Sequence, residues 1–172
     1  AVAAATEMLE CLAGLNQKWI ASGSAPFEIG IGLNHGEVIF AMMGSEEKQE
    51  MTVIGDPVNQ AARIEGLTKK FGVGIVVGEH VADFVKADFY LRSIGSVRTK
   101  GKEQAAELFG VLGPNGSEPD AAMKLKLDWV QDYHSALEAF RRGDLASAET
   151  QFRLCQSRNP SDRVCALYLE HI

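Results

Sequence analysis

The segment that decides the fold lies between residues 51 and 65 and reads Met51-Thr52-Val53-Ile54-Gly55-Asp56-Pro57-Val58-Asn59-Gln60-Ala61-Ala62-Arg63-Ile64-Glu65. Met51–Ile54 follows a polar run and predicts a strand. After Gly55, a helix start is expected, because Asp56 is a capping acid and Pro57 suits the first turn. The helix is expected to run from Pro57 to Lys70. The segment therefore predicts a strand that passes directly into a helix.

Asn59 and Arg63 are the candidate functional residues of this helix. They are four positions apart, so an amide and a guanidinium project from the same face on successive turns. The guanidinium could stabilise negative charge on a reacting phosphate, and the amide could orient a sugar ring. Taken without its surroundings, the same pair also fits the solvated polar face of an ordinary helix.

The neighbouring sequence predicts helices packed on a mixed or antiparallel sheet, which is an α+β fold. Residues 1 to about 20 have the apolar spacing of an amphipathic helix. Further strands are expected at residues 27–40 (continued, or interrupted at residues 34–36), 74–77, 89–97 and 107–112, and a short helix at residues 79–85.

The last third of the chain changes character. Residues 113–119 are rich in Gly, Pro and Ser and predict a linker, and residues 120–172 predict helices only. This tail resembles one tetratricopeptide-like unit through Ala136, Phe140, Gly143, Ala148, Phe152, Asn159 and Pro160. One unit cannot form a solenoid by itself, so the tail is expected to pack on the preceding domain or on a second copy.

The composition excludes several classes of protein. A net charge of −6 and a pI near 5.2 argue against sequence-independent binding to nucleic acid, which needs a clustered basic surface. The three cysteines form no ligand pattern and predict thiols in a reducing compartment. No apolar run approaches the roughly 20 residues that a membrane-spanning helix needs, so no direct membrane contact is expected from this part. None of the four histidines has a partner at metal-ligand spacing.

The segment 51–65 closely resembles the signature of bacterial class III adenylate cyclases. Residues 29–38, Ile29-Gly30-Ile31-Gly32-Leu33-Asn34-His35-Gly36-Glu37-Val38, resemble the strand that precedes this signature, and Val97-Arg98-Thr99-Lys100-Gly101 resembles the family's phosphate-contacting strand. The resemblance implies a nucleotide cyclase domain of ferredoxin-like architecture, incomplete at its N-terminus. Residues 1–112 would be the C-terminal part of that catalytic domain.

The resemblance assigns a role to each candidate residue. Arg63 would stabilise the pentavalent phosphorus as the 3′-hydroxyl of ATP attacks the α-phosphate, and Asn59 would orient the ribose. Lys100 would contact the triphosphate. Thr52 stands where the family reads the purine, and a threonine there favours ATP over GTP, since guanylate cyclases usually carry cysteine. On composition alone, Thr52 is equally a strand residue and Lys100 a solvated turn lysine.

The resemblance also implies components beyond this chain. The family's two metal-binding aspartates lie in the first half of the domain, so the ligands for two Mg²⁺ or Mn²⁺ ions are expected upstream of Ala1, and the 172 residues alone should not turn over ATP. Family active sites form between two protomers, which implies a homodimer. A cytoplasmic location is expected, and similar cyclases often carry sensor or membrane-spanning regions upstream.

Two other functions remain open from the sequence. One is a cyclase-like regulatory domain that binds nucleotide or a partner without chemistry. The other is an interaction module in which the helical tail is the working part and the α+β portion is a scaffold.

Overall fold

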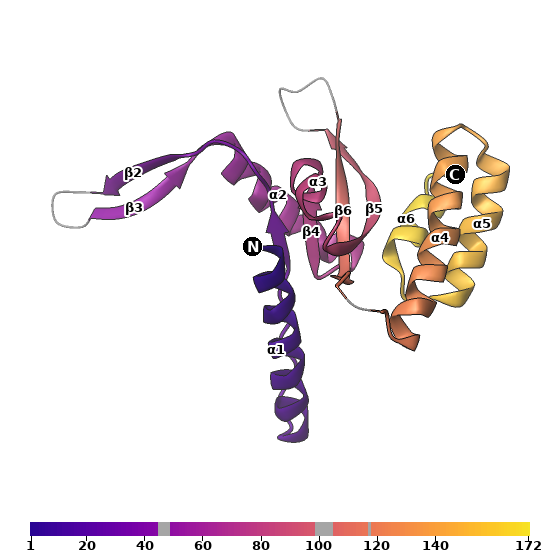
Figure 1. Cartoon of the computed structure of the whole chain (residues 1–172), viewed down its shortest axis with the longest axis horizontal. Helices are drawn as coiled ribbons and strands as arrows, with labels where there is room; N and C mark the ends of the chain where they lie inside the picture. The colour runs from indigo at the N-terminus through magenta and orange to yellow at the C-terminus, as the bar shows by residue number, and fades with distance from the viewer. Residues whose placement is uncertain (45–48, 99–104, 117) are drawn as a thin grey trace.

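The computed structural model describes residues 1–44, 49–98, 105–116 and 118–172 (Figure 1). Across these residues the chain forms a four-stranded sheet, a separate two-stranded hairpin and six helices. In chain order the elements are α1 (Val2–Ala21), β1 (Ile31–Leu33), β2 (Ile39–Gly44), β3 (Gln49–Ile54), α2 (Asp56–Phe71), β4 (Ile75–Gly78), α3 (Glu79–Val85), β5 (Phe89–Arg98), β6 (Ala105–Pro114), α4 (Ala121–Arg141), α5 (Leu145–Arg158) and α6 (Arg163–Leu169).

The four-stranded sheet has the order β1-β4-β6-β5 and contains both strand directions. β1 pairs with β4 in parallel, whereas β6 runs antiparallel to both β4 and β5. A parallel pair needs a crossover connection, and the segment that contains α2 provides it here. The predicted α+β class, with helices on a mixed sheet, is confirmed.

Strand β4 is buried on both faces, and its side chains separate two hydrophobic cores. Ile75 and Val77 point to one face, where α1 and α3 cover the sheet. Val76 points to the other face, because successive side chains of a strand alternate. There it belongs to the same cluster as Ile64 of α2 and the buried side chains of the helical tail.

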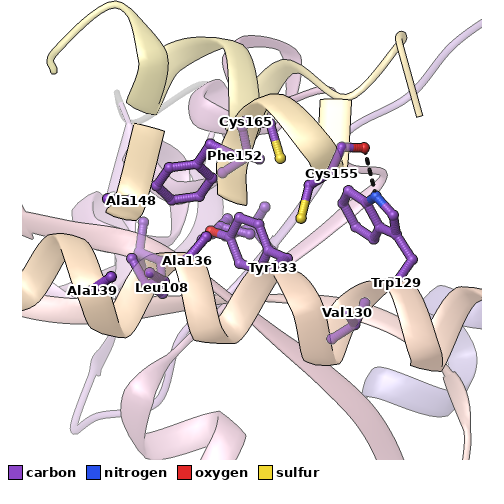
Figure 2. Packing of buried hydrophobic residues seen from close by; sticks show 14 of the residues in the cluster. Leu108, Trp129, Val130, Tyr133, Ala136, Ala139, Ala148, Phe152, Cys155 and Cys165 are labelled. Carbon is purple, nitrogen blue, oxygen red and sulfur yellow. Dashed lines mark hydrogen bonds between the residues drawn. The ribbon is translucent and has the colours of Figure 1, made fainter. Parts of the chain in front are cut away.

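The tail helices α4, α5 and α6 pack through large aromatic side chains (Figure 2). Tyr133 and Phe152 are fully buried, and the Trp129 indole N–H donates to the carbonyl oxygen of Cys155 at 2.8 Å. Leu108 of β6 lies in the same cluster. The core of the tail is therefore continuous with one face of the sheet.

Among the described helices, none combines the length and apolar character needed to cross a bilayer.

The predicted strand at residues 27–40 is divided in the structure. Ile31–Leu33 forms β1 of the main sheet, whereas Ile39 and Phe40 belong to β2 of the hairpin, which projects away from the other elements (Figure 1). Between them, Asn34 is hydrogen-bonded to the start of α2, and Gly36 lies against Pro57. This contact separates the two halves, because it fixes the chain at α2 before β2 begins.

The start of α2 also differs from the expectation. The residue that precedes the helix is Gly55, and Asp56 is the first helical residue, so Asp56 is not the capping acid. Its carboxylate instead accepts a hydrogen bond from the Gln60 side chain at 2.6 Å, one turn further along the helix.

Candidate active site

Asn59 and Arg63 lie on the solvent-facing side of α2. Both are exposed, whereas Ile64 and Thr68 on the opposite side are buried against the sheet. Because Asn59 and Arg63 are four residues apart, their side chains leave the same face of the helix one turn apart. The structure therefore places the amide and the guanidinium together on one open surface.

Two glycines allow α2 to lie directly on β1. A methyl group on Gly32 would collide with the backbone of Ala61 and Glu65 in the middle of α2. A methyl group on Gly30 would collide with the side chain of Thr68. The small residues of the Gly30-Ile31-Gly32 motif thus fix how closely the helix that carries Asn59 and Arg63 approaches the sheet.

Asn34 holds the first turn of α2, a role that the sequence did not reveal. Its side-chain amide donates to the carbonyl oxygen of Pro57 at 3.2 Å and to the Gln60 side chain at 3.3 Å. These partners are more than 20 residues away in the chain. A polar side chain directly after a short, half-buried strand was the available signal, and the sequence pattern only indicated a kink there.

Thr52 lies in β3, three residues before the chain enters α2 through Gly55. It is half-buried and pairs with Ala41 across the hairpin. Directly opposite residues of an antiparallel pair share a face, so Thr52 and Ala41 point to the same side of the hairpin. Successive side chains of a strand alternate, so Met51 and Val53, which are both exposed, point to the other side.

Lys100, the fourth predicted site residue, lies outside the described residues. The described part of β5 ends at Arg98, and β6 begins at Ala105. Three of the four predicted residues are thus placed, all within the continuous stretch from Thr52 to Arg63.

The described residues do not supply a metal site. In the described ranges, no three side chains of His, Cys, Asp or Glu gather closely enough to hold an ion. His35 packs edge-on against the ring of Phe84, and the ring of His134 accepts a backbone hydrogen bond from Ser93. The donor set of this part of the chain does not fit the pair of divalent ions that the resemblance implies.

A cavity of about 400 Å³ lies away from Asn59, Arg63 and Thr52, between α3, the β5–β6 strands and α4. Its lining consists of Glu79, Ala82, Asp83, Lys86, Leu91, Ser93, Glu107, Phe109, His134, Leu137, Glu138 and Arg141. The polar groups in it mostly bind one another: Ser93 donates to Glu107, and Arg141 donates to both. Burial would raise the pKa of the Glu107 carboxyl, but the bonds from Ser93 and Arg141 outweigh it and lower that pKa. The hydrogen bonds beside the cavity therefore join α4 of the tail to β5 and β6. The cavity is distinct from the Asn59–Arg63 surface.

The Asn59–Arg63 surface can bind a phosphate ester. An arginine side chain remains charged at any physiological pH and offers several N–H donors, and an asparagine amide adds two donors and one acceptor. Both lie on a convex helix face that is open to solvent. Binding that excludes water would require a second surface to close over them.

Comparison with known sequences identifies a family that covers most of the chain. Residues 1–111 match the family described as the adenylate and guanylate cyclase catalytic domain. An adenylate cyclase of Anabaena cylindrica is 40% identical over 93 residues, which is 52% of this chain and 18% of that protein. A terminal-differentiation-specific adenylate cyclase of Dictyostelium discoideum is 29% identical over 146 residues, 83% of this chain and 7% of that protein. The second alignment is longer than the family match, so this likeness extends into the helical tail.

Solved structures of similar proteins share the fold. The adenylyl cyclase CyaB from P. aeruginosa is 25% identical with a TM-score of 0.59, covering 69% of this chain and 60% of that chain. The guanylyl cyclase Cya2 is 30% identical with a TM-score of 0.53, covering 67% of this chain and 56% of that chain. The present chain thus spans little more than half of these structures and 7–18% of the two curated relatives.

Proposed function

The chain belongs to the adenylate and guanylate cyclase catalytic domain family, and from this membership we propose that it is part of an adenylate cyclase. The reaction converts ATP to 3′,5′-cyclic AMP and pyrophosphate. The observation that carries the proposal is the pairing of Asn59 and Arg63 on the exposed face of α2, directly after the strand that holds Thr52.

In the proposed reaction, the 3′-hydroxyl oxygen of ATP forms a bond to the α-phosphorus, and its proton is released to water. The bond from the α-phosphorus to the bridging oxygen breaks, and pyrophosphate leaves. Negative charge grows on the equatorial oxygens of the phosphorus, where the fixed charge of Arg63 stabilises it. Asn59 orients the ribose so that the attacking oxygen stays in line.

The base and the triphosphate are assigned to two further residues. Thr52 has a hydroxyl that can donate and accept a hydrogen bond, and we infer that it reads adenine in preference to guanine. Adenylyl and guanylyl cyclases are both among the similar proteins, so they do not decide between the two bases. The support for adenine is the position of Thr52 in the signature. Lys100 would bind the triphosphate, which its place in the third motif supports.

Members of this family generally use divalent metals. We propose that two Mg²⁺ or Mn²⁺ ions take part and that their ligands precede this part of the domain, since the described residues gather no ligand set. The 172 residues alone are then expected to be inactive. Asn59 and Arg63 supply only ribose and phosphate contacts.

The complete site is proposed to form in a homodimer in the cytoplasm. The open face of Asn59 and Arg63 needs a second wall, and the hairpin exposes large apolar side chains as an interface does. We further propose residues 1–112 as the C-terminal part of the catalytic domain, residues 113–119 as a linker, and residues 120–172 as a tetratricopeptide-like tail.

The test is a longer protein that includes the first half of the catalytic domain. Arg63→Ala is expected to lower its rate of cyclic AMP formation from ATP about 100-fold or more, since transition-state charge loses its main partner. Lys70→Ala is the matched control, because it removes one exposed positive charge from the same helix. Near-full activity in Arg63→Ala, with an unchanged circular dichroism spectrum, would refute the assignment. ATP binding without cyclic AMP formation in the unmutated protein would indicate a regulatory domain instead.

A further inference from the structure

The tail is attached to the sheet by a buried ion pair. Arg92 of β5 is 5% exposed, and its guanidinium donates to both carboxylate oxygens of Asp162, at 2.6 and 2.9 Å. The same guanidinium lies over the rings of Tyr133 and Trp129, 3.8 and 4.5 Å from their centres. A charge so deeply buried is tolerated only when it is paired and hydrogen-bonded. The pair therefore fixes the place of Asp162 on β5.

Both partners of this pair remain charged at neutral pH. Burial alone would lower the pKa of the Arg92 guanidinium, but its bonds to Asp162 reverse the effect and raise that pKa. Burial alone would raise the pKa of the Asp162 carboxyl, yet the hydrogen bond from Arg92 lowers it. The two opposite charges therefore attract each other at physiological pH.

A second set of contacts joins helix α4 of the tail to both β5 and β6. The backbone N–H of Ser93 donates to the His134 ring at 3.3 Å, and Arg141 of the same helix donates to Ser93 and Glu107. The β5–β6 register shifts between Tyr90 and Leu91 and again between Ser93 and Gly95, on either side of the contacted residues. The tail therefore contacts β5 and β6 at the place where their pairing is irregular.

The residue that follows Asp162 reaches the helix that carries the proposed site. Arg163, the first residue of α6, donates to the carbonyl oxygen of Lys69 at 2.8 Å. Lys69 lies in the last turn of α2, whose end carbonyls have no partner within the helix. The Arg163 side chain also lies so close to Gly72 that a methyl group there would meet its Cδ at 3.1 Å.

Helix α2 is thus held at three points. Asn34 binds its first turn, Gly32 sets the contact at its middle, and Arg163 binds its last turn. Leu67 and Phe71 of α2 also pack on the core cluster that contains the tail aromatics. The first two supports come from the catalytic domain, and the third comes from the tail.

We propose that α6 is a positioning element for α2: Asp162 is fixed on β5, and the adjacent Arg163 fixes the end of the helix that carries Asn59 and Arg63. This rests on the proposed function, because α2 matters to activity only if those residues act on ATP. Asp162, Arg92 and Arg163 are positioning residues and make no contact with substrate. Because α2 is one continuous helix of 16 residues, we expect added freedom at its last turn to change the orientation of the face that carries Arg63.

The first measurement is amide hydrogen exchange on the 172-residue chain carrying Arg163→Met. The methionine keeps the aliphatic packing on Gly72 and loses the bond to Lys69. Exchange in α2 is expected to become about tenfold faster, since the Lys69 carbonyl in its last turn loses its partner. Arg153→Met is the control, because it removes an exposed arginine from α5 of the same tail. Equal α2 exchange in the two variants overturns the proposal.

A second pair of variants tests the attachment of α6. Asp162 and Asp144 are both N-cap aspartates, accepting from the backbone N–H of Cys165 and Ser147 respectively. Asparagine caps a helix equally well, so Asp162→Asn removes mainly the charge opposite Arg92, whereas Asp144→Asn alters an exposed cap. Faster α2 exchange in Asp162→Asn than in Asp144→Asn is expected, and no difference between them contradicts the role of the ion pair.

The kinetic readout uses the longer protein that contains the whole catalytic domain. Arg163→Met is expected to lower kcat about tenfold with a smaller change in KM for ATP, because a displaced Arg63 stabilises the transition state less than before. Faster α2 exchange with an unchanged kcat overturns the proposal. An unmutated protein that forms no cyclic AMP refutes the proposed function instead, and the positioning of α2 is then decided by hydrogen exchange alone.

Discussion

Gly32 shows how one position controls the placement of the candidate site. It lies in the short strand β1, beside the parallel strand β4, and the backbone of α2 passes directly over it. A side chain would push α2 away from the sheet or force β1 to move. The distance between the sheet and the helix that carries Asn59 and Arg63 therefore depends on the absence of a side chain.

Gly32→Ala is expected to lower the free energy of unfolding by about 1–3 kcal/mol, as overpacking in a dense interior does. Urea unfolding followed by circular dichroism measures the change. Gly66→Ala is the control in α2, the helix that packs on Gly32, because a methyl group on Gly66 meets nothing within 4 Å. The control should gain about 1 kcal/mol, since alanine is the better helix former. Equal stability of both variants would contradict the close packing of α2 on β1.

At the residue scale, the sequence predicts the relative positions of residues within one helix. It does not predict side-chain contacts between residues that are far apart in the chain. The spacing of Asn59 and Arg63 was enough to place them on one helix face. Asn34 could not be assigned, because its partner Pro57 is 23 positions away. Arg92 is a charged residue in a strand. Nothing near it in the sequence indicated that it would be buried and paired with Asp162, which is 70 positions away.

At the scale of elements, the contact between α4 and the β5–β6 strands depends on a neutral histidine. The His134 ring accepts a hydrogen bond from the Ser93 backbone, which requires an unprotonated ring nitrogen. Burial lowers the pKa of His134 below its usual 6.5, and the charges of Arg92 and Arg141 lower it further, against the opposing effect of Glu138 and Glu107.

The free energy of unfolding is therefore expected to fall as the pH falls below about 6.5. Between the folded and unfolded pKa values of His134, the unfolded chain binds more protons, so acid favours unfolding. Urea titrations from about pH 7 to about pH 5 measure this slope, above the range in which Glu107 and Asp162 titrate. His134→Gln keeps an acceptor for Ser93 and should flatten the slope. An unchanged slope in that variant would exclude His134 as its source.

The elements themselves were largely predictable where their pattern is periodic. The helix predicted over residues 57–70 and the one over residues 79–85 match α2 and α3 within one residue at each end. For residues 27–40 the prediction left a continued or an interrupted strand open, and the interrupted alternative is confirmed, because the two halves pair with different strands. Side-chain alternation identifies a strand but does not choose its partner, and a contact to Pro57 made that choice here.

At the scale of the whole molecule, the tail and the catalytic domain share one hydrophobic core. Val76, Ile94 and Leu108 of the sheet lie in the same buried cluster as Tyr133 and the other tail aromatics. The composition of residues 113–119 predicted a linker, and a change to helical pattern predicted a separate tail. Neither signal shows where the tail docks, since an apolar helix face fits a sheet of the same chain as well as a second copy.

The opposite side of the molecule leaves a large apolar surface uncovered. Phe40 pairs with Val53 and Met42 pairs with Met51 across the β2–β3 hairpin, so the four side chains share one face. All four are exposed, with Phe40 at 71% and Met51 at 73%. A two-stranded hairpin is marginally stable in water by itself, so this face is expected to be covered in the proposed homodimer.

The double variant Phe40→Ser/Met51→Ser is expected to shift the longer protein from dimer to monomer in sedimentation velocity. Losing two large apolar side chains from one interface weakens association by about 2–4 kcal/mol, roughly a 30- to 1,000-fold rise in Kd. Leu125→Ser is the control, because Leu125 is 67% exposed on α4, far along the chain from the hairpin. If the active site needs both protomers, cyclic AMP formation should fall in parallel with the dimer fraction and recover at high protein concentration. A double variant that remains dimeric at low concentration would show that the two copies meet through another surface, and the open face of Asn59 and Arg63 would then need a different partner.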